Sequence, residues 1–245
     1  MLAAYRFVIG GFGRAITLAT LLVLSVAQAP GQVLIEPVVV ELGARQRAAS
    51  VTITLSPKAA GPLLLQSEVL QWEQALDGSS RNQPSADLVV VPPIVELKPG
   101  ESQLLRIGQR GPRRAAGEQA YRLVLEDVSI ASSGPGLSFR MRYDLPVLLA
   151  PAEPVRQALR WQSCAPNPAE ICVRLANEGN RRITLRKLEV SGADWTLSVP
   201  AAGTVLAGTE REWRLPLPVG GHGAAQRIAG ETSRGKVLRA ELPAL

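Results

Sequence analysis

The chain has 245 residues, of which 46% are hydrophobic and only 4% aromatic, and it contains 19 prolines and 22 glycines. This length and composition suit one large or two small globular domains, and we favour two. The 27 basic residues exceed the 21 acidic residues only modestly and are not interleaved with stacking aromatic side chains, which argues against a nucleic-acid-binding protein.

Residues 1–29 have the pattern of a secretory signal peptide. A basic, mostly apolar start is followed by an apolar run over 15–26 and by small residues at Ala27 and Ala29. Cleavage after Ala29 would leave Pro30 first, so cleavage after Ala27 is an alternative. The apolar core is short for a membrane span and no later segment approaches that length. We therefore expect an exported protein with no membrane span after signal removal.

The rest of the first half predicts a series of short β-strands separated by turn residues, with no trustworthy helical period. Alternating or apolar runs interrupted by Pro, Gly and Asp-Gly signals occur at 33–42, 49–55, 63–72, 88–91, 94–97, 102–107 and 121–128. Pro37 lies inside the first of these runs, which fits an edge strand or a strand that breaks. About seven strands before Pro151 indicate an immunoglobulin-like sandwich.

The stretch 137–150 carries the longest alternation in the chain. Apolar side chains occupy every second position at Leu137, Phe139, Met141, Tyr143, Leu145 and Val147. In an extended strand these side chains share one face, whereas the apolar run over 147–149 is expected to be buried on both faces. One interpretation is a central strand of an ordinary sandwich. The other is an edge strand that offers its apolar stripe to another protein by strand addition.

A composition change at 151–154, where two prolines bracket a short polar linker, marks a domain boundary. We expect an N-terminal domain over 30–151 and a smaller all-β domain over 152–245. The only two cysteines, Cys164 and Cys172, lie in the second domain. In an exported protein we favour a disulfide between them over free thiols or a metal pair.

The sequence gives little sign of catalysis. A lone histidine, His222, has no clear serine or cysteine partner and no metal-ligand motif. Adjacent acids such as Glu126 and Asp127 face opposite ways in a strand and cannot act together. We therefore expect a protein that is not an enzyme and that has no cofactor and no metal site.

Three motifs in the first half carry a family resemblance. They are VPPIVELKPGESQLLRI at 91–107, GEQAYRLVLEDV at 117–128, and the stripe that ends in DLPVLLAPA at 144–152. Their order and spacing resemble the periplasmic pilus-assembly chaperones of the chaperone-usher pathway, with an ending closer to the spore-coat-U and other archaic types. The second domain matches weakly, mainly through LANEGNRRITL at 175–185.

The resemblance implies an all-β fold of two immunoglobulin-like domains in an L-shaped arrangement, located in the periplasm. It implies that the stripe is the last strand of the first domain and is lent to a pilin subunit that lacks its own final strand. The donating positions would be Leu137, Phe139, Met141 and Tyr143. The implied partners are pilin subunits and an outer-membrane usher, and self-association is a second way to cover the stripe of the free protein.

The resemblance also implies charged sites. The family holds the subunit's terminal carboxylate with two basic residues, but the matching positions here are Val39 and Pro146, so the anchor is either absent or moved to side chains such as Arg142 or Arg106. A buried ion-pair network matches better.

The members of this buried ion-pair network would be Arg106 and Glu118, with Glu231 from the second domain as a third. The alternative to this whole interpretation is a secreted two-domain adhesin or structural subunit that has no client.

Overall fold

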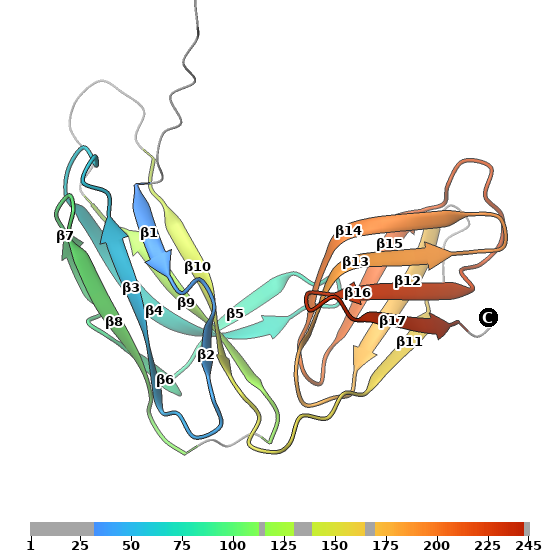
Figure 1. Ribbon diagram of the computed structural model, residues 1–245, viewed down its shortest axis with the longest axis horizontal. Helices are drawn as coiled ribbons and strands as arrows, with labels where there is room; N and C mark the ends of the chain where they lie inside the picture. Colours follow the sequence, from blue (N-terminus) through green and yellow to red (C-terminus); the bar gives the residue numbers. More distant parts are fainter. Residues whose placement is uncertain (1–31, 113–115, 130–138, 165–169, 243–245) are drawn as a thin grey trace, which may run out of the picture. The chain divides into compact units, whose positions relative to one another are not determined.

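The computed structural model describes residues 32–112, 116–129, 139–164 and 170–242, and within these ranges the regular elements are β-strands. The expected signal peptide lies outside the described residues. In the described ranges, no helix has the length and hydropathy that a membrane crossing requires. The strands form four sheets, two in each half of the chain (Figure 1).

The first half is a two-sheet sandwich of strands β1 to β10. Their bounds are Val33–Glu36, Val40–Leu42, Ala48–Leu55, Leu63–Gln74, Ser80–Pro84, Leu88–Val91, Ile94–Leu97, Ser102–Gln109, Gln119–Asp127 and Arg142–Leu149. One sheet has the order β1-β3-β8-β6, and the other has the order β2-β10-β9-β4-β5 with β7 also paired to β4. The alternating side chains of these strands fill one core, with Val51, Ile53 and Leu105 each fully buried.

The second half is a sandwich of strands β11 to β17. Their bounds are Leu159–Ser163, Glu170–Asn177, Ile183–Ser191, Thr196–Val205, Glu210–Pro216, Arg227–Thr232 and Val237–Glu241. The two sheets have the orders β11-β12-β15 and β14-β13-β16-β17 and enclose a separate core around Val173, Leu188 and Val190. The expected domain boundary at 151 and 152 lies between β10 and β11.

The run over 33–42 does break at Pro37, and its two parts join different sheets. Strand β1 pairs with β3, whereas β2 pairs in parallel with the end of β10. A proline has no backbone N–H for a ladder, so it suits a crossing point between sheets. The two parts of this run, β1 and β2, therefore form the edge strands of the two sheets on the same side of the sandwich.

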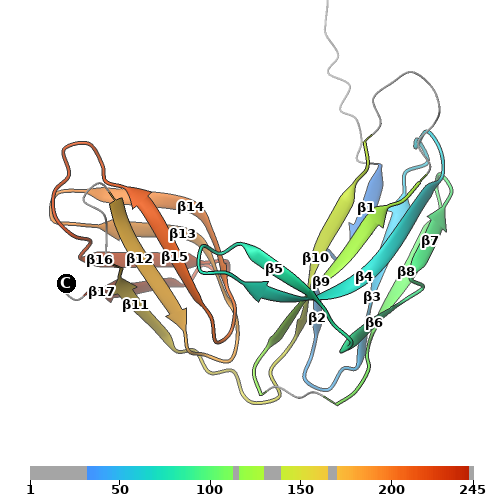
Figure 2. The same ribbon diagram turned by 180° about the vertical axis from the view of Figure 1, so that it is seen from behind.

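Strand β5 has no counterpart among the sequence predictions, because its polar residues SRNQP show no apolar alternation. It forms a long hairpin with β4 around Gly78, whose φ of 85° suits a residue without a side chain (Figure 2). The hairpin end is held by residues of the second half, since Gln74 donates to the Thr204 carbonyl at 2.7 Å. Tertiary contacts therefore stabilise a strand that local sequence does not favour.

Candidate strand-addition site

The site begins with an unpaired backbone edge on β10. This strand pairs with β9 along its whole length, but on its other side β2 covers only Val147–Leu149. Within the described part of the chain, the outer edge over 142–146 therefore has no neighbouring strand. Pro146, which cannot donate a backbone hydrogen bond, stands where the β2 ladder begins. Such an edge is a template for an added strand.

The apolar stripe passes from solvent into the core along this edge. The side chains of Phe139 and Met141 are 74% and 52% exposed, Tyr143 is partly buried against the core, and Leu145 is 4% exposed. Leu137 lies outside the described residues. Two large, strongly exposed apolar side chains on one face, next to an open edge, are typical of an interaction surface.

The strand itself is shorter than the sequence pattern suggests. The alternation predicts one strand from 137, but β10 begins at Arg142. The reason is that its partner β9 ends at Asp127, whose N–H donates to the Met141 carbonyl at 2.9 Å as the last contact of the ladder. Beyond that point the described stripe residues have no strand on either side. An added strand would have to supply the missing hydrogen bonds.

A second open edge lies on the same side of the sandwich. Strand β1 pairs with β3 only, and the chain passes within a few residues from β1 into β2 at the edge of the other sheet. Leu34 and Val38 on this segment are 54% and 66% exposed. The two sheets are therefore both open along the side that carries the stripe.

The two positions that the resemblance assigns to a carboxylate anchor lie beside this edge, and neither is basic. Val39 is 41% exposed, and Pro146 is directly opposite Arg122 of β9. The Arg122 guanidinium stacks over the Trp72 ring at 3.6 Å and lies 3.5 Å from the Asp144 carboxylate. Burial lowers the pKa of Arg122, and the charge of Asp144 opposes that shift.

Arg122 is not among the basic residues expected for the anchor. The expected alternatives, Arg142 and Arg106, are both exposed. Arg142 begins β10, whereas Arg106 belongs to the other sheet. The cross-strand position of Arg122 follows from strand register, which only the structure provides.

The expected ion-pair network needs correction. Arg106 is exposed on the outer face of its sheet, because it alternates with the buried Leu105 and Ile107, and it forms no ion pair with a described residue. Glu231 pairs with Arg186 instead. Neither residue therefore contacts Glu118.

Glu118 is paired with two arginines that follow a turn in the second half. Its side chain is 3% exposed, and it accepts from the Arg182 side chain at 2.5 Å and from the Arg182 backbone N–H at 3.0 Å. Arg181 lies 3.7 Å away, and Glu41 also pairs with both arginines. The sequence patterns therefore did not identify Arg181, Arg182 or Glu41 as members of the network. The one available sign was that both arginines lie in LANEGNRRITL, the motif that carries the resemblance of the second half.

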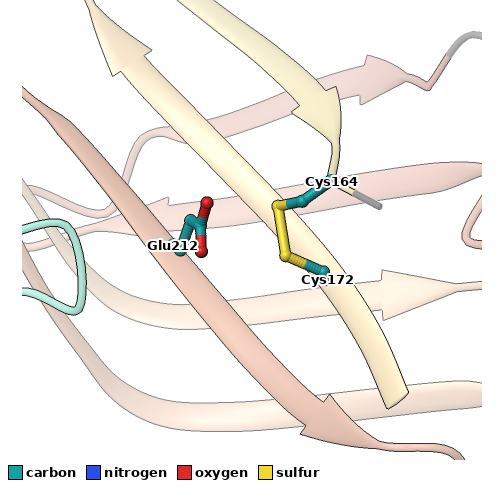
Figure 3. Close-up of side chains that lie close together, drawn as sticks. All are labelled: Cys164, Cys172 and Glu212. Atoms are coloured by element: carbon teal, nitrogen blue, oxygen red, sulfur yellow. A yellow bond between two sulfur atoms is a disulfide. The ribbon is translucent and has the colours of Figure 1, made fainter. Parts of the chain in front are cut away.

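Cys164, the residue after β11, and Cys172 of β12 form a disulfide in the second half (Figure 3). The carboxylate of Glu212 on β15 lies beside it, and the two sulfurs and a carboxylate oxygen lie within 4.8 Å of one another, a spacing that would suit metal ligands. However, the two sulfurs are bonded to each other, and Glu212 accepts hydrogen bonds from Arg174 at 3.0 Å and from Arg214 at 3.2 Å. These bonds make the group part of the sandwich rather than an open ligand set.

The Arg174–Glu212 pair predicts a pH-dependent stability. The hydrogen bond from Arg174 lowers the pKa of Glu212, whose side chain is 8% exposed, below the ordinary value of about 4.3. The pair thus stabilises the fold above that pH, and the contribution is lost as pH falls through the lowered pKa. At pH 7, Arg174→Met should reduce the free energy of unfolding by about 1 to 3 kcal/mol, less than for a wholly buried pair because Arg174 is 29% exposed.

Urea denaturation of parent and variant at pH 7 and at pH 3 would measure this effect. The difference between the two proteins should shrink at the lower pH. Arg160→Met is the matched control, since Arg160 and its partner Glu178 are 53% and 54% exposed and their pair should contribute little. A difference that stayed constant with pH would contradict the assignment.

Comparison with known proteins relates this geometry to a family. A sequence model described as "Pili and flagellar-assembly chaperone, PapD N-terminal domain" matches residues 32–154. No curated protein sequence matched the chain.

Solved structures share the fold over most of the chain. A chain in the CsuC-CsuE chaperone-tip adhesion subunit pre-assembly complex from the archaic chaperone-usher Csu pili of Acinetobacter baumannii is 20% identical, with a TM-score of 0.66, and the match covers 88% of this chain and all (100%) of that one. The E. coli chaperone DraB is 21% identical with a TM-score of 0.57, covering 86% and 98%. The Salmonella enterica SafA pilin complex with the SafB chaperone gives 18% identity and a TM-score of 0.55, covering 86% and 96%. The two-sandwich fold is thus that of these chaperones.

Proposed function

The chain belongs to the pili and flagellar-assembly chaperone family defined by a PapD N-terminal domain, and from this premise we propose that it is a periplasmic chaperone for pilin subunits. It would hold a subunit by lending its own stripe as the missing strand and would deliver that subunit to an outer-membrane usher. The division into domains 30–151 and 152–245 and the removal of residues 1–29 are part of the same proposal.

The observation that carries this proposal is the pairing of an open edge with exposed apolar side chains. The outer edge of β10 over 142–146 has no neighbour among the described residues, and Phe139 and Met141 directly before it are exposed. An immunoglobulin-like subunit that lacks its final strand has an open sheet edge beside an apolar groove. This surface is complementary to the exposed stripe and open edge of the present chain. One added strand satisfies both partners through backbone hydrogen bonds and apolar burial.

Arg122 is our candidate for the cation that meets the subunit's terminal carboxylate. It lies opposite Pro146, at the point where the resemblance implies a basic residue on β10. Its guanidinium is already partly desolvated and has Asp144 at 3.5 Å, so a second carboxylate would compete with that contact. The proposed role requires binding and release of a subunit and no catalytic group.

A co-expression experiment tests the proposed function. A pilin encoded near this gene should accumulate in periplasmic extracts only when the chaperone is present, and the two chains should elute together from a sizing column. A pilin that remains soluble at the same level without the chaperone, or that never elutes with it, would reject the proposal. The alternative, an adhesin without a client, predicts that the pilin never elutes with this protein.

A further inference from the structure

A basic pocket lies in the second sandwich, away from the stripe. Its volume is about 350 Å³, and it is formed by the segment before β11, the start of β13 and the turn between β16 and β17. The cationic residues that line it are Arg156, Arg181, Arg182, Arg234 and Lys236. No aspartate or glutamate is among its lining residues in the described ranges. Five cations around one small cavity repel one another unless an anion compensates them.

Carboxylates outside the pocket compensate only part of this charge. Arg181 and Arg182 form the ion pairs with Glu118 and Glu41 described above. These pairs fix the orientation of the two guanidinium groups, which lowers the entropy cost of a further contact.

The other three cations have no carboxylate within ion-pair distance among the described residues. Arg156 donates to the Glu178 backbone carbonyl at 2.7 Å, and the Lys236 ammonium lies 3.3 Å from the Gln157 amide oxygen. These contacts to neutral oxygens position Arg156 and Lys236 and leave their charges uncompensated. Arg234 shares the charge of Glu41 with Arg181 and Arg182, without an ion pair of its own. The pocket therefore carries an excess of positive charge.

The turn between β16 and β17 carries Arg234 and Lys236, two of the cations that form no ion pair with a described residue. Gly235, with φ of 78°, allows a tight turn in which the Gly235 N–H donates to the Thr232 carbonyl at 2.9 Å. The Lys236 backbone N–H also donates to the Thr232 hydroxyl at 3.1 Å, and Thr232 is 7% exposed. Arg234 and Lys236 thus flank a fixed turn at the rim of the pocket.

We propose that this pocket binds a small multivalent oxyanion that carries phosphate or carboxylate groups. Guanidinium groups bind such oxygens through paired, charge-assisted hydrogen bonds, and several cations at separate points favour more than one anionic group on the ligand. The cavity volume is at the lower end of the range of small-molecule sites, roughly 300 to 1,000 Å³. The site involves no residue of the stripe, so the inference does not rest on the proposed chaperone function.

Calorimetric titration of the mature protein with sodium pyrophosphate and with citrate, at constant ionic strength, tests this inference. Both anions should bind with one-to-one stoichiometry, and acetate, which has a single charge, should bind far more weakly. The double variant Arg234→Gln/Lys236→Gln should weaken binding at least about tenfold, since each lost charge-assisted hydrogen bond corresponds to roughly that factor.

A matched control removes the same two positive charges from β16 and β17, the strands that this turn connects. Arg227 of β16 and Arg239 of β17 lie outside the lining of this pocket, so Arg227→Gln/Arg239→Gln should bind both anions like the parent. Equal losses in the two double variants would show a general charge effect and overturn the site. Absence of binding heat and of any thermal shift with both anions would overturn it as well.

Folding does not limit the test, because both double variants change exposed side chains. Thermal unfolding without anion would verify this. If the turn variant were nevertheless unstable, Arg156→Gln changes the pocket from the segment before β11 and should also weaken binding about tenfold. Unchanged affinity in that variant would reject the proposal.

Discussion

Replacing Phe139 and Met141 by glutamate is expected to remove pilin from the periplasm while the chaperone itself still accumulates. Fully burying one large apolar side chain contributes roughly 1.5 to 3 kcal/mol, so losing two should weaken subunit binding at least about a hundredfold. Two unpaired carboxylates in an apolar groove add a further desolvation cost. The measurements are pilin levels by immunoblot and pilus assembly at the cell surface.

The chaperone should keep its fold because the exposed part of the stripe contributes little to the core. Phe139 and Met141 are exposed, whereas Leu145, Val147 and Leu149 are buried and remain unchanged. Thermal unfolding of the purified variant should therefore match the parent within a few degrees.

Leu104→Glu is the matched control. Leu104 is 53% exposed, close to the 52% of Met141, but it lies on β8 in the other sheet and outside the open edge. This variant should support normal pilin levels. If pilin and pili were also normal with both stripe substitutions, strand donation by this stretch would be wrong.

The period of two along the chain was sufficient to predict most of the first sandwich. Alternation at 49–55 corresponds to β3, and the buried run over 147–149 corresponds to the end of β10. Alternation does not show where a ladder ends, because that depends on the partner strand. Residues 139–141 alternate like a strand and yet have no strand on either side in the described part of the chain.

Charged contacts between distant segments could not be predicted from the sequence. Arg106 and Glu118 lie near each other in sequence, but the alternation along β8 places Arg106 on the outer face of its sheet. Glu118 instead meets Arg182, which is 64 residues away. Only the paths of the intervening strands determine this pairing, and no local pattern encodes them. The polar strand β5 could not be predicted for a related reason. Tertiary contacts stabilise its hairpin, and its sequence shows no apolar alternation.

Because Glu118 pairs with Arg182, replacing Arg182 by methionine (Arg182→Met) is expected to lower the free energy of unfolding. Glu118 would keep the backbone N–H of residue 182 at 3.0 Å and Arg181 at 3.7 Å, but its carboxylate, which is 3% exposed, would lose the side-chain hydrogen bond from Arg182. Breaking a buried ion pair costs about 3 to 5 kcal/mol, and the remaining arginine places our expectation near the lower value. The midpoint of urea denaturation of the purified mature protein measures it.

Two further variants make the result specific to the pair. Arg106→Ala should leave stability within about 0.5 kcal/mol of the parent, because Arg106 is exposed and has no ion pair among the described residues. Glu118→Gln combined with Arg182→Met should recover part of the loss, since the desolvated charge is then removed together with its partner. An Arg182→Met protein as stable as the parent, or a double variant less stable than the sum of the two single changes, would show that the pair does not stabilise the fold in this way.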